Sequence, residues 1–387
     1  MSDAYLVDPD VEFIKEIGKL GGQDVKKCFQ CATCSVACPI SPDEKPFPRK
    51  EMLATSWGLK DRLIGNGDIW LCHNCGDCST KCPRGAKPGD VLAAVRSYAV
   101  AEYAIPKALG KMVNNPGALP VLLGIPAALL LVLGLLLNVV GFTFHGQPML
   151  NFSPTGADIW GHSYFNNILV DIIMVPTFTA AIIVFLLGLK NFLTDIHNNA
   201  VLEGKTKVDK IDPVGMVQAL IRIAPTILKH QKFSECTDNK DRSTSHMMVL
   251  FGFIGLFIVT ACFFVAEWVL QIGGPYSQLN PIKWLGNIGG IALIIGSGLM
   301  IAKRMAKTDQ VSAYKDWYLL GLVMGLGVTG LLTELIRLAG LYPLMGLIYF
   351  LHLILVWALF AYTPFSKLAH LVYRTVAMTY QEYSGRN

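Results

Sequence analysis

The sequence predicts an all-α protein in which a small helical soluble domain is followed by a bundle of six transmembrane helices. Of its 387 residues, 52% are hydrophobic and only 16% are charged, a balance typical of a membrane protein with an attached soluble part. The apolar residues are unevenly distributed, because residues 1–110 have the polar composition of a globular domain and residues 111–387 contain long apolar runs. We therefore expect a domain boundary near residue 110.

Eight of the ten cysteines lie in two runs of the soluble domain that share the spacing C-x2-C-x2-C-x3-C-P. This spacing is typical of two-cluster ferredoxins, in which three cysteines of a run bind one [4Fe–4S] cluster and the fourth binds the other. The spacing assigns Cys28, Cys31, Cys34 and Cys82 to a first cluster, and Cys72, Cys75, Cys78 and Cys38 to a second. Disulfides are rare in the cytoplasm, and zinc sites use two separated pairs of ligands, so both alternatives are less favourable.

The rest of the soluble domain is predicted to be helical. Apolar residues recur at helical spacing between the cysteine runs, and they indicate one amphipathic helix that ends in a turn at "GNGD", residues 65–68. A second helix is expected over residues 89–104, after the second run. We therefore expect a small helical two-cluster ferredoxin domain.

Six segments are long and apolar enough to cross a hydrocarbon core, which takes about 20 residues. They are residues 118–140, 168–189, 247–270, 284–302, 317–339 and 343–364. The loop 141–167 contains no lysine or arginine, whereas 190–245 contains nine. Because basic loops stay on the cytoplasmic side, we expect both termini and the ferredoxin domain in the cytoplasm and the spans in the inner membrane. The basic residues lie mostly in the loops between the apolar runs, which membrane topology explains. We therefore expect no nucleic-acid partner.

The long basic loop contains an apolar segment, residues 213–228. Val214, Val217, Ile221, Ile227 and Leu228 fall near one helical face, and the basic residues of the segment lie off it. Such a helix either lies on the membrane surface or docks a partner protein, and the pattern leaves both uses open.

Two histidines in the last apolar stretch are candidate haem ligands. His352 lies inside the sixth span, where an ionisable residue is costly unless it has a function. His370 follows eighteen residues later, five turns and about 27 Å along a straight helix, a separation suited to two haem b groups at two depths. Each iron takes a second imidazole, for which we expect His246 opposite His370 and His162 opposite His352. The alternative is that these histidines cap helices or make polar contacts.

The motifs together resemble known families. The stretch "DIWLCHNCGDCSTKCPRG" resembles the C subunit of heterodisulfide reductases, and H-x17-H on the last span resembles the cytochrome b subunit of respiratory nitrate reductase. Their fusion resembles the membrane subunit of the quinone-interacting membrane-bound oxidoreductase complex of sulfate reducers. Position 256 is Leu256, where the nitrate reductase pattern has a second histidine on the helix of His246, so one or two haems are expected.

This resemblance implies a subunit of a quinone-dependent oxidoreductase. Such a subunit would oxidise menaquinol and pass electrons through haem b and two [4Fe–4S] clusters to partner subunits that carry flavin and iron–sulfur centres. The final acceptor would be adenylylsulfate reductase, so the terminal reduction would occur on another chain. For the quinone site we expect Glu334 and Arg337, three residues apart on the fifth span.

Two other classes share these motifs. One is a heterodisulfide reductase-like or sulfite-reduction-associated membrane complex, which would differ in its soluble partner. The other is a non-enzymatic anchor whose clusters sense the redox state of the membrane, although such sensors carry an output domain that the sequence does not indicate.

Overall fold

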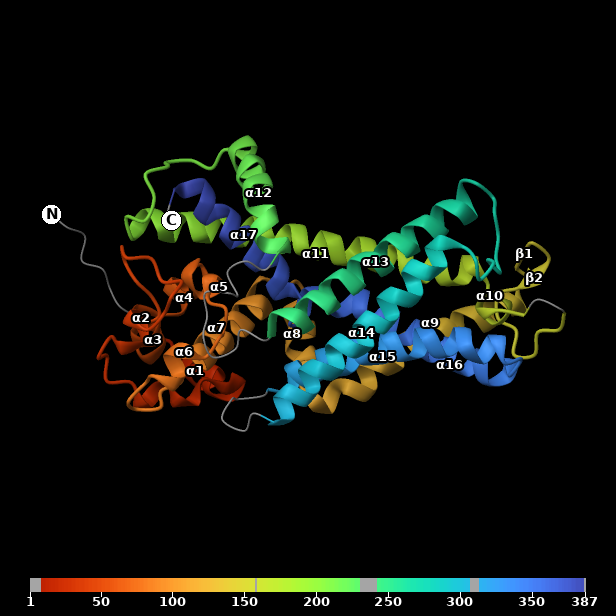
Figure 1. Ribbon diagram of the computed structural model, residues 1–387, viewed down its shortest axis with the longest axis horizontal. Coiled ribbons are helices and arrows are strands. Elements are labelled where there is room, and N and C mark those ends of the chain that lie inside the picture. Colours follow the sequence, from red (N-terminus) through yellow and green to blue (C-terminus); the bar gives the residue numbers. More distant parts are fainter. Residues whose placement is uncertain (1–7, 157–158, 230–241, 307–312, 386–387) are drawn as a thin grey trace.

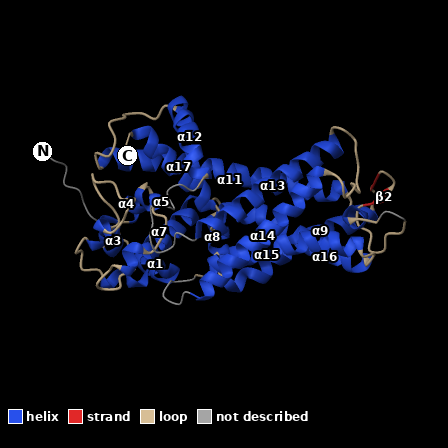
Figure 2. Ribbon diagram, in the orientation of Figure 1, coloured by secondary structure: helices blue, strands red, loops and turns tan. Residues whose placement is uncertain are grey.

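The structure is a computed structural model that describes residues 8–156, 159–229, 242–306 and 313–385. Almost all of its regular structure is helical, as the sequence predicts (Figure 2). Short helices gather at the end of the molecule that contains the N-terminus, and long helices run side by side toward the other end (Figure 1).

The soluble end is built from short helices around an apolar core. Asp10 caps the first of them, because its Oδ1 accepts a hydrogen bond of 2.8 Å from the Phe13 amide. Phe13, Ile17 and Trp70 are buried in the core beside the longest helix of this end, α7. The helices are α1 (Val11–Ile17), α2 (Thr33–Val36), α3 (Arg49–Ser56), α4 (Lys60–Ile64), α5 (Asp68–Leu71), α6 (Asp77–Thr80) and α7 (Pro88–Tyr103).

The prediction of a single helix between the cysteine runs is wrong, because the segment forms three helices, α3, α4 and α5. The break between α3 and α4 contains Gly58, whose φ of +69° favours glycine. A Cβ at this position would lie 2.7 Å from the carbonyl oxygen of Asp10, so the close approach of the N-terminal segment also requires glycine.

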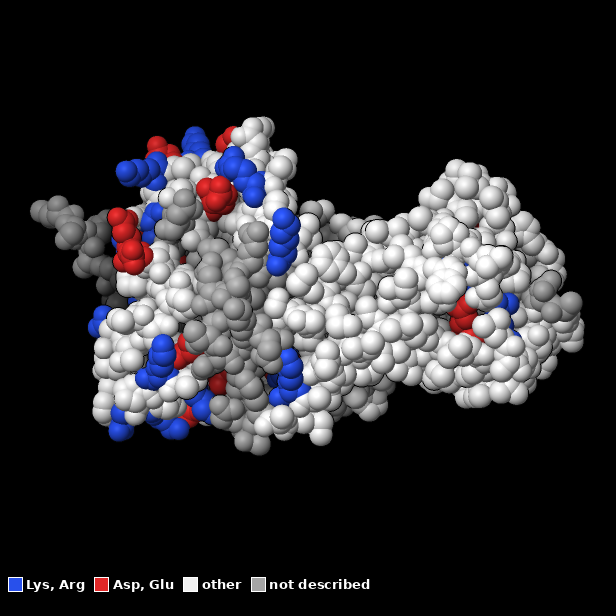
Figure 3. Space-filling view, viewed as in Figure 1, with Lys and Arg blue, Asp and Glu red and all other residues white. Residues whose placement is uncertain are grey.

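Within the described residues, six helices are long and apolar enough to span a membrane, which confirms the predicted number. Many of their leucines are exposed, including Leu135 and Leu186, as expected for side chains that face lipid. Figure 3 shows charged side chains at both ends of the molecule and a white, uncharged region between them. The helices are α9 (Leu119–Val139), α11 (Asn167–Leu202), α13 (Arg242–Trp268), α14 (Pro281–Ala306), α15 (Tyr314–Leu338) and α16 (Tyr342–Tyr362).

Helix α11 is longer than a membrane requires. Its 36 residues extend about 54 Å, against a hydrocarbon core of about 30 Å. The excess reaches the soluble end, where Phe192 and Ile196 are buried in one core with Trp70. The membrane part and the ferredoxin part therefore share a packed interface.

The remaining elements are shorter. A two-stranded antiparallel hairpin follows α9, so the described part is not purely helical. In the bundle, α14 packs between α13 and α15, and α16 packs against α15, α11 and α9. These shorter elements are α8 (Lys107–Val113), β1 (Thr143–Phe144), β2 (Gln147–Pro148), α10 (Gly161–Tyr164), α12 (Pro213–Leu228) and α17 (Ala369–Ser384).

The final stretch is not one continuous helix. Helix α16 ends at Tyr362, a 3₁₀ turn covers Thr363–Phe365, and α17 begins at Ala369. Pro364 lacks the amide hydrogen that a continuing α-helix needs, which explains the break. His352 and His370 therefore lie on different helices, so the single straight helix assumed for their separation is wrong.

Helix α12 packs on α17 through one side and exposes the other. Met216, Ile223 and Ile227 are partly buried against the core around α17. Val217 and Ile221 are 57% and 67% exposed. Figure 1 shows α12 lying across the long axis of the bundle.

Candidate iron–sulfur and haem sites

The structure brings the cysteines together in the two predicted groups of four. A small cavity is lined by Cys28, Cys31, Cys34 and Cys82, three residues from one run and one from the other. Burial and the neighbouring Cys28 and Cys82 thiolates raise the pKa of Cys34 to about 11. Four thiols around one cavity form the donor set of a [4Fe–4S] cluster.

The second group combines three cysteines of the second run with Cys38 of the first run. Burial, together with the thiolates of Cys72 and Cys75, raises the pKa of Cys38 to about 12. The pKa of Cys78 is raised in the same way by burial and by Cys72, Cys75 and Cys38. Among the described residues, no three histidine, cysteine or acidic side chains converge on a point suited to one metal ion.

Both runs fold into the same loop. Gln30 and Ala32 have positive φ values, and Asn74 and Gly76 have positive φ values at the equivalent positions of the second run. The turn points an amide at a sulfur, since the Asn74 amide donates to Cys72 Sγ over 3.3 Å. Such N–H···S bonds adjust the reduction potential of a bound cluster.

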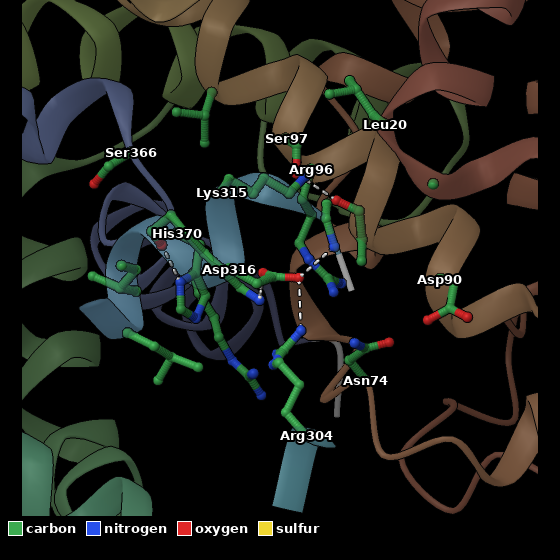
Figure 4. Close-up of a pocket in the computed structure, with 18 of the residues that line it drawn as sticks. Leu20, Asn74, Asp90, Arg96, Ser97, Arg304, Lys315, Asp316, Ser366 and His370 are labelled. Carbon is green, nitrogen blue, oxygen red and sulfur yellow. Dashed lines mark hydrogen bonds and ion pairs between the residues drawn. The ribbon is translucent and has the colours of Figure 1, made fainter. Parts of the chain in front are cut away.

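A second cavity, of about 240 Å³, lies where the soluble end meets the bundle (Figure 4). We call it the junction cavity. His246 at the start of α13 and His370 at the start of α17 both line it, although they lie far apart in the sequence. Cys72 of the second cysteine group lines the same cavity.

The junction cavity has a positive lining. Among its described lining residues, the acidic ones are Asp90 and Asp316, whereas the basic ones are Arg96, Lys303, Arg304, Lys315, Lys367 and Arg374. Asp316 pairs with Arg304 over 2.9 Å and also with Lys367. The remaining excess of positive charge favours an anionic ligand, such as one with carboxylates.

The His370 ring is held in a form suited to metal binding. Its Nδ1 lies 2.5 Å from the Lys367 carbonyl oxygen and can only donate to it, which leaves Nε2 as the unprotonated ring nitrogen. Burial, reinforced by the cations of Lys367, Arg96 and Arg374, lowers the pKa of His370 to about 3. The ring is therefore neutral at physiological pH, as an iron ligand must be.

His352 is oriented in a similar way inside the bundle. Its Nδ1 lies 2.9 Å from Thr329 Oγ1 of α15. The single hydroxyl hydrogen of Thr329 is donated to the Gly325 carbonyl oxygen over 2.7 Å, so Oγ1 accepts from His352. Gly330 provides space for the ring, because a Cβ there would lie 3.2 Å from it. His352 therefore also presents an unprotonated Nε2.

His162 lies on α10, before the second span begins. Its ring centroid is 5.9 Å from that of Tyr349, one helical turn from His352 on α16. Burial lowers the pKa of His162 to about 4, and its buried Nδ1 has no hydrogen-bond partner in the described part of the chain. A buried imidazole nitrogen without a partner fits a ligand role.

The two residues expected at the quinone site, Glu334 and Arg337, both lie on α15. Glu334 of α15 forms an ion pair of 2.7 Å with Lys283 of α14. Arg337 lies one turn beyond Glu334 on the same helix. The Glu334 carboxylate is therefore paired with a lysine of a neighbouring helix.

Two arginines that sequence reasoning did not single out contact the second cysteine run. Arg96 of α7 donates to the Ile69 carbonyl oxygen over 2.6 Å, and Arg374 of α17 lies 2.8 Å from His73 Nδ1. Arg374 is one turn from His370, so α17 connects the junction cavity to the second cysteine group. The i, i+4 spacing of His370 and Arg374 is the signal that could have indicated this link.

The chain resembles known protein families in both of its parts. Residues 24–86 match the family described as 4Fe-4S dicluster domain. Residues 174–386, more than half of the chain, match the family described as citrate utilization protein B. The chain belongs to the citrate utilization protein B family.

Two curated relatives match part of this chain. Both are named as the C subunit of H(2):CoB-CoM heterodisulfide,ferredoxin reductase, from Methanothermobacter thermautotrophicus and Methanothermobacter marburgensis, and both are 36% identical over 112 residues. The match covers 28% of this chain and 60% of each relative. No solved structure matches the chain.

Proposed function

We propose that this chain is a membrane electron-transfer subunit. It accepts electrons from a menaquinol in the bilayer and passes them to partner subunits that carry flavin and iron–sulfur centres. The observation that supports this most directly is the junction cavity, in which His246 and His370 face the same space as Cys72. A haem ligand pair beside a cluster ligand is the arrangement that electron transfer between the two cofactors requires.

The chain's own residues would hold four cofactors. The two cysteine groups would bind two [4Fe–4S] clusters, His246 and His370 would bind one haem b, and His352 with His162 would bind a second. When bound, these groups supply one-electron carriers at successive depths. The hydrogen bonds of His370 and His352 would fix the tautomer that binds iron, and the cations of the junction cavity would pair with haem propionates.

The junction cavity must widen to admit a haem. Its free volume of about 240 Å³ lies below the roughly 300–1,000 Å³ of pockets that enclose drug-sized ligands. Long side chains such as Lys303 and Arg304 line it, and they can turn outward while their stems stay packed.

Quinol oxidation releases two protons with its two electrons, so the quinone site needs a base. We propose that Glu334, held by Lys283, accepts a proton and that Arg337 helps to position the quinone. Both residues lie at the end of α15 that is remote from the junction cavity, because Lys315 at the start of α15 lines that cavity.

For the whole complex, we propose a quinone-interacting membrane-bound oxidoreductase whose final acceptor is adenylylsulfate reductase. The relatives are named as one subunit of a heterodisulfide,ferredoxin reductase, which favours partner subunits for this chain as well. A second candidate follows from the description of the family, citrate utilization protein B. In that case electrons would flow the other way, from a soluble partner that oxidises a carboxylic acid to quinone.

The experiment is cofactor analysis of the purified chain with His370→Ala, His352→Ala and the control His145→Asn, a residue of the exterior hairpin. We expect about eight cluster irons per chain and b-type haem that falls in each of the first two variants. Haem reduction by a menaquinol analogue, followed by cluster reduction observed by EPR, would support the proposed direction. Wild-type haem content in both alanine variants would refute the proposed ligands.

A further inference from the structure

The two cysteine groups differ in their access to solvent. Cys72 and Cys78 of the second group are buried, and Cys72 lines the junction cavity. In the first group, Cys31 is exposed at the surface. If electrons enter at the junction cavity, as the proposed function requires, they leave the chain at the first group.

The surface around the first group carries unusually exposed apolar side chains. Phe29, next to Cys28, is 69% exposed, and Val36 of α2 is 87% exposed. We call the patch of Phe29, Cys31, Val36, Arg49 and Arg84 the exit surface. A large aromatic ring in water at a redox centre is typical of the apolar middle of a docking interface.

The charge around these apolar residues is positive. The guanidinium of Arg84 lies 4.1 Å from the centroid of the Phe29 ring, in cation–π geometry. Arg49 donates to the Gln30 carbonyl oxygen over 3.1 Å and lines the cavity of the first group together with Arg84. Lys26 and Lys81 are exposed nearby in the sequence, whereas Asp24, the adjacent acid, is paired with Lys27 over 2.7 Å.

We propose that the exit surface docks an acidic redox protein and transfers electrons to it from the first cysteine group. The positive rim would steer an acidic partner, and Phe29 with Val36 would form the dry centre of a small, transient interface. Each transfer moves one electron from this chain to a flavin or iron–sulfur centre of the partner, without a proton or a bond change. This inference rests on the proposed function.

The test uses the full-length chain, reduced and freed of reductant, with two probes: an acidic and a basic c-type cytochrome. Stopped-flow absorbance measures the rate of cytochrome reduction. We expect Arg84→Glu to slow reduction of the acidic probe about tenfold at low salt and to accelerate reduction of the basic probe, because charge steering changes sign. Added salt should reduce both differences.

The matched control is Lys19→Glu, an equal charge reversal just after α1, where Lys19 pairs with Glu16 of that helix. It should leave both rates unchanged. EPR of each variant measures the clusters independently. If the clusters are present and Arg84→Glu behaves like the control, the proposed docking at the exit surface is refuted. The proposed function would still stand. If no clusters are found in the wild-type chain, both are refuted.

A different observation concerns α12, which lies outside the six spans. At 100° per residue, Leu220, Val217, Leu228, Ile221 and Val214 occupy one sector of about 120°, and all five are exposed. Polar residues follow on the neighbouring sector, where Arg222 bonds Glu382 of α17 over 3.0 Å. The described helix contains no acidic residue.

We propose that this apolar sector lies in the membrane surface. Helix α12 lies across the long axis of the bundle and packs on α17, so one of its sides would face the lipid headgroups (Figure 1). A helix with one apolar face and no acidic residue is the type that binds this interface. The apolar sector would continue the lipid-facing surface of α11, where Leu186 and Leu187 are exposed.

The test places the photo-cross-linker p-benzoylphenylalanine at Val217, and at its polar neighbour Gln218 as the control. The full chain is reconstituted in vesicles of phosphatidylethanolamine and phosphatidylglycerol, irradiated, and analysed by mass spectrometry. We expect phospholipid adducts at position 217 and few at 218. Equal adducts at both positions, or only protein adducts at 217, would overturn this proposal and favour a protein partner.

Discussion

Replacing Thr329 with valine tests the proposed role of His352 by a change that keeps the shape of the side chain. The variant removes the oxygen that accepts from His352 Nδ1 over 2.9 Å. Loss of such a partner to a metal-binding histidine typically reduces metal affinity 10- to 100-fold, about 1.4–2.8 kcal/mol. The Gly325 carbonyl oxygen also loses its hydroxyl donor, but it keeps its helical amide partner.

The assay is the rate of haem transfer from the purified protein to excess apomyoglobin. We expect about a 10- to 100-fold faster loss of the haem bound at His352 in Thr329→Val, with the haem at His370 unaffected. Thr333→Val is the matched control, because the Thr333 hydroxyl lies one turn along α15 and bonds the Thr329 carbonyl oxygen over 2.7 Å. Equal rates in both variants would refute the role assigned to Thr329 and, with it, the orientation of His352.

Three further predictions concern the soluble end. Gly58→Ala should lower the free energy of unfolding by roughly 1–3 kcal/mol in denaturant titration, because φ is +69° and the new Cβ would contact Asp10; an unchanged midpoint would contradict this. Burial and Asp68 raise the pKa of Glu51 to about 8, so its contribution to stability is largest at low pH and is lost as pH rises from about 4.5 through 8. Glu51→Gln should therefore flatten the decline in melting temperature between about pH 5 and 8, and a parallel decline would show that another group causes it. Cys82→Ser should remove the EPR signal of the first cluster alone, whereas the free Cys262→Ser is the control; loss of the second cluster instead would reverse the assignment.

Local signals in the sequence were sufficient for the fold class. Long apolar runs predicted the six membrane helices, because the length of a span depends only on the thickness of the bilayer. The cysteine spacing predicts which four thiols share a cluster, because the fourth cysteine of each run in a two-cluster ferredoxin binds the other cluster. The break at Gly58 was missed because only the approach of Asp10 from a distant segment requires it.

The candidate haem site needed more than local signals. His352 was conspicuous because a histidine is rare in an apolar helix, but Thr329, which orients it, lies on another helix and looks like any membrane threonine. The predicted pairing of His246 with His370 rested on membrane depth alone. The structure brings both to the junction cavity because Pro364 breaks the last helix there.

The sequence by itself determined the helical class and the number of spans, since each follows from periodicity or apolar length within a short segment. Only the tertiary structure decided how these parts meet. The excess length of α11 and the direction of α17 join the soluble end to the bundle, and this joint creates the cavity shared by His370 and Cys72. Contacts between residues hundreds of positions apart depend on how whole helices pack, which no local pattern encodes.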